Sequence, residues 1–260
     1  LYVRNDPRES DTKIDNVETD SSFGSDSDCS LYSLDPKDVI GEVDAVLVAT
    51  DIGSEHVARC QPFIDADVPI FIDKPLCDNL SDLEIFQKWI GEGKNFISSS
   101  AMRYCKEYEP YHLSTHELGD LRYVNITMAK SWEKYGIHAL ETVYPIVGPG
   151  FDSVQNIGDK NRNIVHLHHS KGIDINIANI SDMLGGFGLI SLMGTKSGIQ
   201  IKSTDTYYAF KKQLQSYVNY LQTGQKPVPW NETYELMQLV SAGIESREKG
   251  GIKITLNKDK

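Results

Sequence analysis

The sequence has few cysteines and no long apolar run. Only four of its 260 residues are cysteines (Cys29, Cys60, Cys77 and Cys105), and none has the C-x-x-C spacing. So few cysteines in a chain of this size indicate reduced thiols rather than a disulfide framework, and we expect a cytoplasmic protein. No apolar run approaches the length of a membrane span, and no signal-peptide core opens the chain, so we expect no membrane partner.

Basic residues are also in deficit. The chain has 26 Lys and Arg against 37 Asp and Glu, a formal net charge of −11. This balance argues against a nucleic-acid partner or an anionic membrane surface, and it favours a small-molecule substrate. The simpler interpretation is that the charge keeps the protein in solution.

Two further patterns are missing. No G-x-G-x-x-G motif occurs in a strand–helix context, and Gly185-Gly186-Phe187-Gly188 is interpreted as a hairpin turn because no buried parallel strand precedes it. His166 and His168 share one face of a predicted strand, but no acid or cysteine completes a zinc spacing. The pair His112 and His116 is not part of an H-E-x-x-H motif. We therefore predict no metal site.

The most informative segment that is present runs over 43–75. It predicts a strand at 43–50, a helix at 54–66 and a strand at 68–72, which ends in Asp73-Lys74-Pro75. Ligands bind outside the carboxyl ends of the strands in an open parallel sheet. The pattern therefore predicts Lys74 at a ligand site, aimed by the turn that Pro75 fixes. Such a lysine can polarise a substrate oxygen, and the alternative is a surface lysine beside a loop proline.

The alternation of strands and helices continues to about residue 100. It predicts an α/β, Rossmann-like domain with a parallel sheet over 1–100. Residues 5–38 are polar and acidic and are expected to form a loop, apart from a short helix at 34–40 that Asp35 caps and Pro36 begins.

The pattern then changes, and residues 101–260 are expected to form an α+β domain with a mainly antiparallel open sheet. Glycines separate the apolar runs between 151 and 203, which indicates consecutive antiparallel strands. One helix of this part is predicted to carry Phe210, Leu214, Tyr217, Val218 and Leu221 on a single side. The other expected elements are a strand at 121–129 and helices at 107–118, 138–148, 207–221 and 233–249.

A second constellation surrounds His138, which begins a predicted helix directly after Gly136-Ile137. Histidine is the side chain best suited to move a proton near neutral pH. Glu141 follows one helical turn later and can orient the imidazole or face water. The alternative is a helix-terminal histidine that hydrogen-bonds only to the backbone.

Taken together, these residues resemble the Gfo/Idh/MocA family of oxidoreductases. VPIFIDKPL is similar to the family stretch that ends in Glu-Lys-Pro, with Asp73 in place of the glutamate. SSSAMRYCKEYEP resembles the strand and Arg-aromatic element that open the second domain, which includes Arg103, and YGIHALETVYPIVG resembles the helix that carries the catalytic histidine. The segments MGTKSGIQI and LQTGQKPVPWNETYELMQLVSAGIESREKG are similar to the late sheet and closing helices.

The resemblance implies an NAD- or NADP-dependent enzyme that transfers a hydride between the nicotinamide and a sugar or polyol carbon. Lys74 would contact the reacting hydroxyl and the cofactor, and His138 would be the general acid and base. The cofactor-facing strand ends would include Thr50, Asp51, His56, Asp73 and Pro75. The open C-terminal sheet would form a homo-oligomer.

Two departures from the family leave alternatives open. Lys134 stands where the family has an acid, and a cation there is expected to lower the pKa of His138 if it lies close. Glu133, Tyr135 or Glu141 can substitute for that acid. The phosphate-binding βα unit is also missing, so about 30 residues are expected before Leu1. Leu1–Asp6 would then be the second strand, with Asp6 near the adenine ribose.

The protein is therefore interpreted as a dehydrogenase. The alternative is a catalytically inactive relative that binds a sugar or serves assembly.

Overall fold

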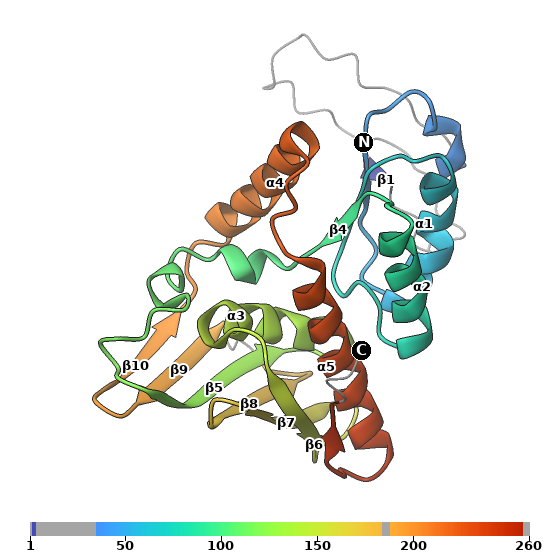
Figure 1. Ribbon diagram of the computed structural model, residues 1–260. Coiled ribbons are helices and arrows are strands. Elements are labelled where there is room, and N and C mark those ends of the chain that lie inside the picture. The colour runs from blue at the N-terminus through green and yellow to red at the C-terminus, as the bar shows by residue number, and fades with distance from the viewer. Residues whose placement is uncertain (1, 4–34, 184–187, 257–260) are drawn as a thin grey trace.

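The computed structural model describes residues 2–3, 35–183 and 188–256 (Figure 1). Its first sheet has four parallel strands in the order β1-β2-β3-β4. The strands are β1 (Tyr2–Val3), β2 (Val46–Val48), β3 (Ile70–Ile72) and β4 (Phe96–Ser98). All three residues of β3 and of β4 are buried, as expected of parallel strands covered on both faces. The expected Rossmann-like sheet is confirmed.

Helices α1 (His56–Asp65) and α2 (Leu80–Gly91) connect the strands of this sheet. The side chain of Asn79 caps α2 by accepting a hydrogen bond from the backbone of Asp82, 2.9 Å away. The short helix predicted near Asp35 is confirmed as a 3₁₀ helix, Pro36–Val39, whose first turn Asp35 caps.

The strand β1 pairs directly with β2, with Tyr2 opposite Leu47 and Val3 opposite Val48. The predicted second strand of a Rossmann sheet lies one place further out in the usual 3-2-1-4-5-6 order. In this structure β1 takes the place next to β2, where the first strand of the usual order lies, and the assignment of 1–6 as the second strand stays a prediction. The backbone groups along the edge of β2 find hydrogen-bond partners in this way. Asp6 lies outside the described residues.

The second sheet has seven strands in the order β10-β9-β5-β8-β7-β6-β11. Every neighbouring pair is antiparallel except β5 and β8, which are parallel. The mainly antiparallel sheet is confirmed, but its strands are not strictly consecutive, because β5 lies between β8 and β9. The strands are β5 (Leu121–Ala129), β6 (Phe151–Asn156), β7 (Arg162–His169), β8 (Ile173–Ile180), β9 (Leu189–Gly194), β10 (Gly198–Lys202) and β11 (Ile254–Thr255).

Helices α3 (Ile137–Val147) and α5 (Trp230–Glu248) lie on one face of this sheet (Figure 1). None of the described helices covers the opposite face (Figure 1). None of them is both long enough and apolar enough to cross a lipid bilayer. The helix α3 follows a single π-helical turn, Trp132–Gly136, which lies beside the end of β5.

The predicted helix over 107–118 is wrong. The structure has only a 3₁₀ turn there, Glu109–Tyr111. Distant contacts hold this segment open, because the Tyr108 hydroxyl donates to the carbonyl of Gly188 and accepts from the amide of Ser203, 3.1 Å away. These tertiary contacts outweigh the local helical preference.

Helix α4 (Thr206–Thr223) packs on the parallel sheet with a different face from the one predicted. Tyr217 and Tyr220 are buried against Phe71 and Ile97, and the Phe71 and Tyr217 rings lie 5.5 Å apart. The Tyr217 hydroxyl reaches the carbonyl of Pro69 at 3.2 Å. The other predicted residues, Phe210, Leu214, Val218 and Leu221, are 39–55% exposed. The long tyrosines, which can hydrogen-bond to the strand backbone, determine the packed face.

Candidate active site

The carboxyl ends of the parallel strands meet the start of α3 at Lys74. This lysine is only 9% exposed, and its ammonium lies 3.5 Å from the carboxylate of Asp73 and 5.2 Å from the ring centre of Tyr135. The Tyr135 ring makes an edge contact with the imidazole of His138, with 4.8 Å between ring centres. The Lys74–Pro75 peptide bond is cis. Lys74 and His138, which are 64 positions apart in the sequence, thus share Tyr135 as a neighbour.

The imidazole of His138 is buried and held from one side by Ser100. Its Nδ1 lies 2.6 Å from Ser100 Oγ, which also accepts a hydrogen bond from the backbone amide of Met102 at 3.0 Å. Burial lowers the pKa of His138 well below its usual range, and the ammonium groups of Lys74 and Lys130 add to this effect. The imidazole is therefore neutral at neutral pH, the form that can accept a proton.

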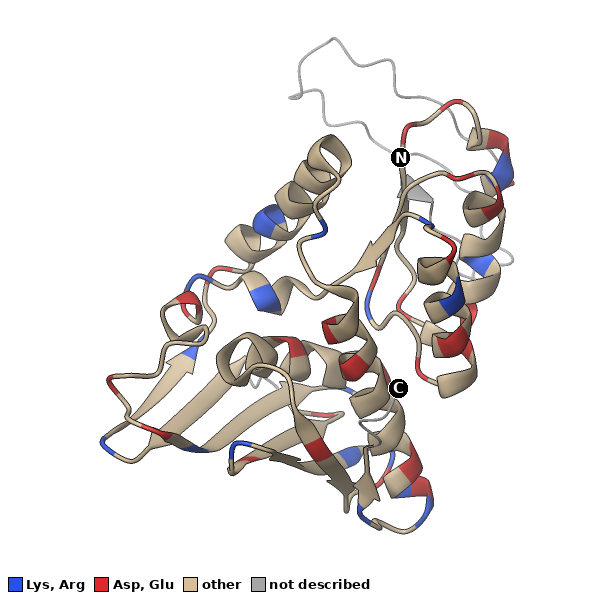
Figure 2. Ribbon diagram, viewed as in Figure 1, with Lys and Arg blue, Asp and Glu red and all other residues tan. Residues whose placement is uncertain are grey.

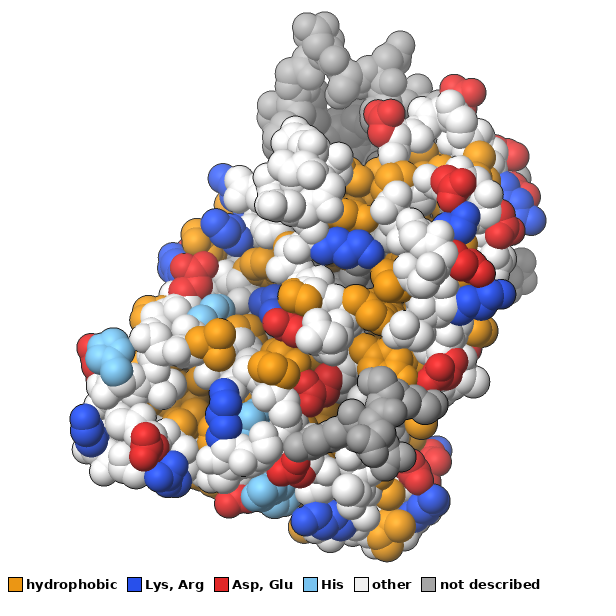
Figure 3. All heavy atoms as spheres, viewed as in Figure 1, with side chains coloured by type: hydrophobic (Ala, Val, Ile, Leu, Met, Phe, Trp, Pro, Cys, Tyr) orange, Lys and Arg blue, Asp and Glu red, His pale blue; other side chains and the backbone are white. Residues whose placement is uncertain are grey.

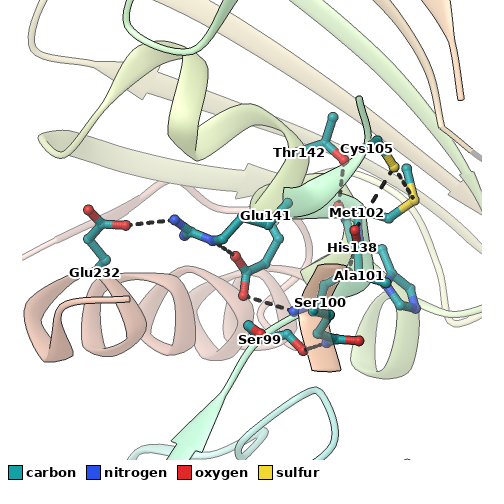
Figure 4. A network of polar contacts seen from close by, with 11 residues as sticks. Ser99, Ser100, Ala101, Met102, Cys105, His138, Glu141, Thr142 and Glu232 are labelled. Atoms are coloured by element: carbon teal, nitrogen blue, oxygen red, sulfur yellow. Dashed lines mark hydrogen bonds and ion pairs between the residues drawn. The ribbon is translucent and has the colours of Figure 1, made fainter. Parts of the chain in front are cut away.

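Glu141 does not contact His138. Its carboxylate accepts hydrogen bonds from the backbone amide of Ser100, at 3.1 Å, and from the guanidinium of Arg103. Arg103 also binds Glu232 at 2.9 Å, so this mostly buried guanidinium links Glu141 and Glu232, the two acids labelled in Figure 4. Burial raises the pKa of Glu141, and Arg103 opposes that shift. Glu141 therefore holds the backbone of the serine that contacts His138.

Glu133 and Tyr135 are the other two residues predicted to substitute for the family acid. Glu133 points away and pairs with Arg247. Tyr135 contacts His138 only through its ring. Ser100 is the hydrogen-bond partner of the imidazole at Nδ1, where the resemblance leads one to expect a carboxylate.

Lys134 pairs with Asp51, with 3.0 Å between Nζ and Oδ1. Lys134 was expected to lower the pKa of His138 only if it lay close, and the cations that lower this pKa are instead Lys74 and Lys130. Burial acts to raise the pKa of Asp51, but the hydrogen bond and charge of Lys134 outweigh it, and the net shift is downward. Lys134 thus links the turn before α3 to the end of β2.

Sequence reasoning missed Ser100 and Lys130. Lys130 directly follows β5, and its Nζ donates to the Tyr135 hydroxyl at 2.6 Å and lies 4.4 Å from the ring centre. Ser100 follows β4 at the carboxyl edge of the parallel sheet. The rule that selected Lys74 applies equally to Ser100. Lys130 follows a strand of the other sheet, so no sequence signal pointed to it.

The remaining predicted cofactor residues lie at the end of β2. His56 is fully buried, and its two ring nitrogens lie 2.9 Å from the carbonyl of Thr50 and 3.0 Å from that of Leu76. His56 therefore braces two strand ends, and its nitrogens are already occupied. By contrast, Thr50 Oγ1 is buried without a hydrogen-bond partner among the described residues. An unpaired polar atom of this kind fits a polar ligand group at the strand end.

The part of the chain that the structure describes has no cluster of metal-binding side chains. No three His, Cys, Asp or Glu side chains there are placed to hold a metal ion. His166 instead pairs with Asp174 at 2.9 Å, and His168 with Asp152 at 3.2 Å. Residues 185–187 of the predicted glycine-rich turn, which ends at Gly188, lie outside the described residues.

No protein-family model matches this chain, and no curated protein sequence matches it. Solved structures do. A myo-inositol dehydrogenase from Corynebacterium glutamicum superposes with a TM-score of 0.72 and 19% identity, over 86% of this chain and 84% of the other.

Two further solved structures carry ligands. An Agrobacterium radiobacter oxidoreductase, in complex with NAD+, L-tartaric acid and magnesium, gives a TM-score of 0.73 at 15% identity, over 85% of this chain and 83% of the other. A Lactobacillus casei myo-inositol dehydrogenase, in complex with NAD(H) and myo-inositol, gives 0.71 at 16% identity, over 86% and 81%.

The chain has the Gfo/Idh/MocA fold. The expected fold class is therefore confirmed: a Rossmann-like sheet followed by a mainly antiparallel mixed sheet. In this fold, Lys74 and His138 lie where the two sheets approach each other. The convergence of Lys74 and His138 on Tyr135 makes the pair the candidate active site.

Proposed function

We propose that the protein is an NAD- or NADP-dependent dehydrogenase of a sugar or polyol. The observation that carries this proposal is the convergence of Lys74 and a neutral His138 on Tyr135. A buried ammonium beside a neutral imidazole can bind a hydroxyl oxygen and remove its proton. The ligands named for the solved structures, NAD and inositol, fit this chemistry.

Each residue has a role that follows from its surroundings. Lys74 binds the reacting oxygen and stabilises negative charge on it, since the ammonium is nearly buried. His138 takes the alcohol proton in oxidation and returns it in reduction. Ser100 fixes the imidazole through Nδ1, and we assign the transferred proton to Nε2.

The cofactor side of the site is less complete within the described residues. Thr50 Oγ1 and Lys74 would hold the nicotinamide end, because one is an unpaired buried hydroxyl and the other a cation at the neighbouring strand end. The cofactor supplies the hydride acceptor. A glycine-rich turn for its pyrophosphate is not among the described residues.

The test is a fluorescence titration of the full-length gene product with NADH and NADPH, followed by oxidation assays with polyols. We expect binding of one dinucleotide and turnover that Lys74→Ala and His138→Asn each abolish, with folding checked by circular dichroism. Binding of neither dinucleotide would sink the proposal.

A second candidate is a catalytically inactive sugar-binding or assembly protein. One observation favours it: Lys134 stands where the resemblance leads one to expect an acid, and it pairs with Asp51. Sugar binding without hydride transfer, in a preparation that binds the dinucleotide, would support this alternative.

We also propose that the open face of the second sheet joins two copies of the chain. Exposed apolar side chains lie among polar ones along this face, among them Tyr123, Ile164 and Met193. Light scattering should give a dimer or larger assembly, and Ile164→Lys with Met193→Lys should yield monomers. A monomeric parent protein would contradict this interface.

A further inference from the structure

The charges around Tyr135 do not balance. Two lysines have a carboxylate partner: Lys74 pairs with Asp73 at 3.5 Å, and Lys134 pairs with Asp51 at 3.0 Å. Within the described residues, Lys130 forms no ion pair with a carboxylate. Its ammonium contacts the hydroxyl and the ring of Tyr135. Three ammonium groups thus face two carboxylates, which leaves one positive charge beside the candidate active site.

Three other acids, on α3, α5 and the turn before α3, pair with arginines. Glu141 and Glu232 both bind Arg103, on the far side of Ser100, and Glu133 binds Arg247. They do not neutralise Lys130. The two lysines that lower the pKa of His138 are Lys74 and Lys130, which supports the view that both ammonium groups lie within electrostatic range of the imidazole.

This local excess of positive charge contrasts with the chain as a whole, whose formal net charge is −11. In Figure 2, acidic segments mark α2 and α5, and on the face in Figure 3 acidic and basic side chains are interspersed. A positive site on an acidic protein favours anions at that site over anions elsewhere on the surface. A neutral polyol would leave this charge unused.

We propose that the substrate is a polyol that carries an anionic group, a carboxylate or a phosphate, and that Lys130 binds that group. The inference rests on the proposed function, since it assigns the substrate class of the same site. Lys74 follows β3 of the parallel sheet and Lys130 directly follows β5 of the second sheet, and both ammonium groups lie near the Tyr135 ring, so one substrate would contact the catalytic lysine and the anchoring lysine from different sheets. A lysine is a point charge without the fork of an arginine, so it accepts either anion.

The experiment compares matched ligands by calorimetry with the NAD(H)-loaded protein: D-glucose, D-glucuronate and D-glucose 6-phosphate. We expect at least one anion to bind more tightly than glucose. Lys130→Gln should weaken that anion about tenfold, the scale of one hydrogen bond to a charged group, and leave glucose unchanged. Lys130→Glu should reverse the preference.

Lys196→Gln is the matched control. Lys196 is also exposed, but it lies at the other end of β5, roughly 30 Å away for a strand of that length. Equal binding of glucose and both anions, or equal losses in Lys130→Gln and Lys196→Gln, would overturn the inference. Selective, Lys130-dependent anion binding without hydride transfer would uphold the inference and refute the proposed dehydrogenase. The two failures are thus distinguishable.

Discussion

Ser100 Oγ lies 2.6 Å from Nδ1 of His138, and this contact joins the end of the parallel sheet to the first turn of α3. The same hydroxyl accepts the amide of Met102, and the backbone of Ser100 is held by Glu141. The imidazole is therefore oriented by a fixed hydroxyl, where the family resemblance leads one to expect a carboxylate four residues upstream.

Ser100→Ala should lower kcat about tenfold to a hundredfold with little change in KM, because the imidazole loses the group that fixes its tautomer and direction. Ser100→Thr should restore most of the loss. The measurement is steady-state kinetics with the preferred dinucleotide. Ser98→Ala, two residues earlier in β4, is the control. An equal loss in both variants would mean that strand packing, and not His138, is affected.

His138 should make stability depend on pH. Its folded pKa lies below the unfolded value of about 6.5, so the unfolded chain takes up the proton first as the solution becomes acidic. Stability from this group is complete above about pH 6.5 and declines below it. Urea unfolding at about pH 7.5 and about pH 5.5 should show a smaller decline in His138→Gln than in the parent. An identical decline would locate the effect in other groups.

Lys130→Gln should also shift the acid limb of kcat/KM to higher pH, because it removes one of the cations that lower the pKa of His138. The shift should shrink as salt is added, since Lys130 is exposed to solvent. The profile is measured with a neutral polyol, so that substrate binding by Lys130 does not contribute. Lys196→Gln should leave the profile in place.

Replacing Arg103 should be the most damaging single change to stability. Arg103→Met would leave the buried carboxylate of Glu141 without its cation, at a cost of about 3 kcal/mol or more in the free energy of unfolding. Arg122→Met, which breaks the exposed pair with Asp120, should cost no more than about 1 kcal/mol. Urea unfolding of both variants tests the contrast, and similar losses would contradict it.

Lys134→Met should have little effect on stability, since the pair with Asp51 is more than one third exposed on both sides. Lys134→Asp should not increase turnover, because Ser100 already orients His138. Assays of both variants with the best substrate test this point. A large gain in Lys134→Asp would instead favour the inactive-relative interpretation of the parent.

The sequence was sufficient for the parts of the structure that local patterns determine. The strand end that carries Lys74 and the helix that carries His138 were predicted because a buried strand and a glycine–histidine helix start are local signals. The packed face of α4 was not, because the Tyr217 hydroxyl binds Pro69, 148 positions away. The partner of His138 was missed for the same reason: Ser100 is 38 positions away.

Because Ser100 holds His138, residue 134 need not be an acid that orients the imidazole. Ser100, and not residue 134, contacts Nδ1 of the imidazole. Residue 134 here is a lysine that ties the turn before α3 to Asp51. A motif search that requires an acid four residues before the histidine would pass over this chain. A search for a serine directly after β4, followed by Gly-x-His at the start of α3, would select the arrangement that this chain has.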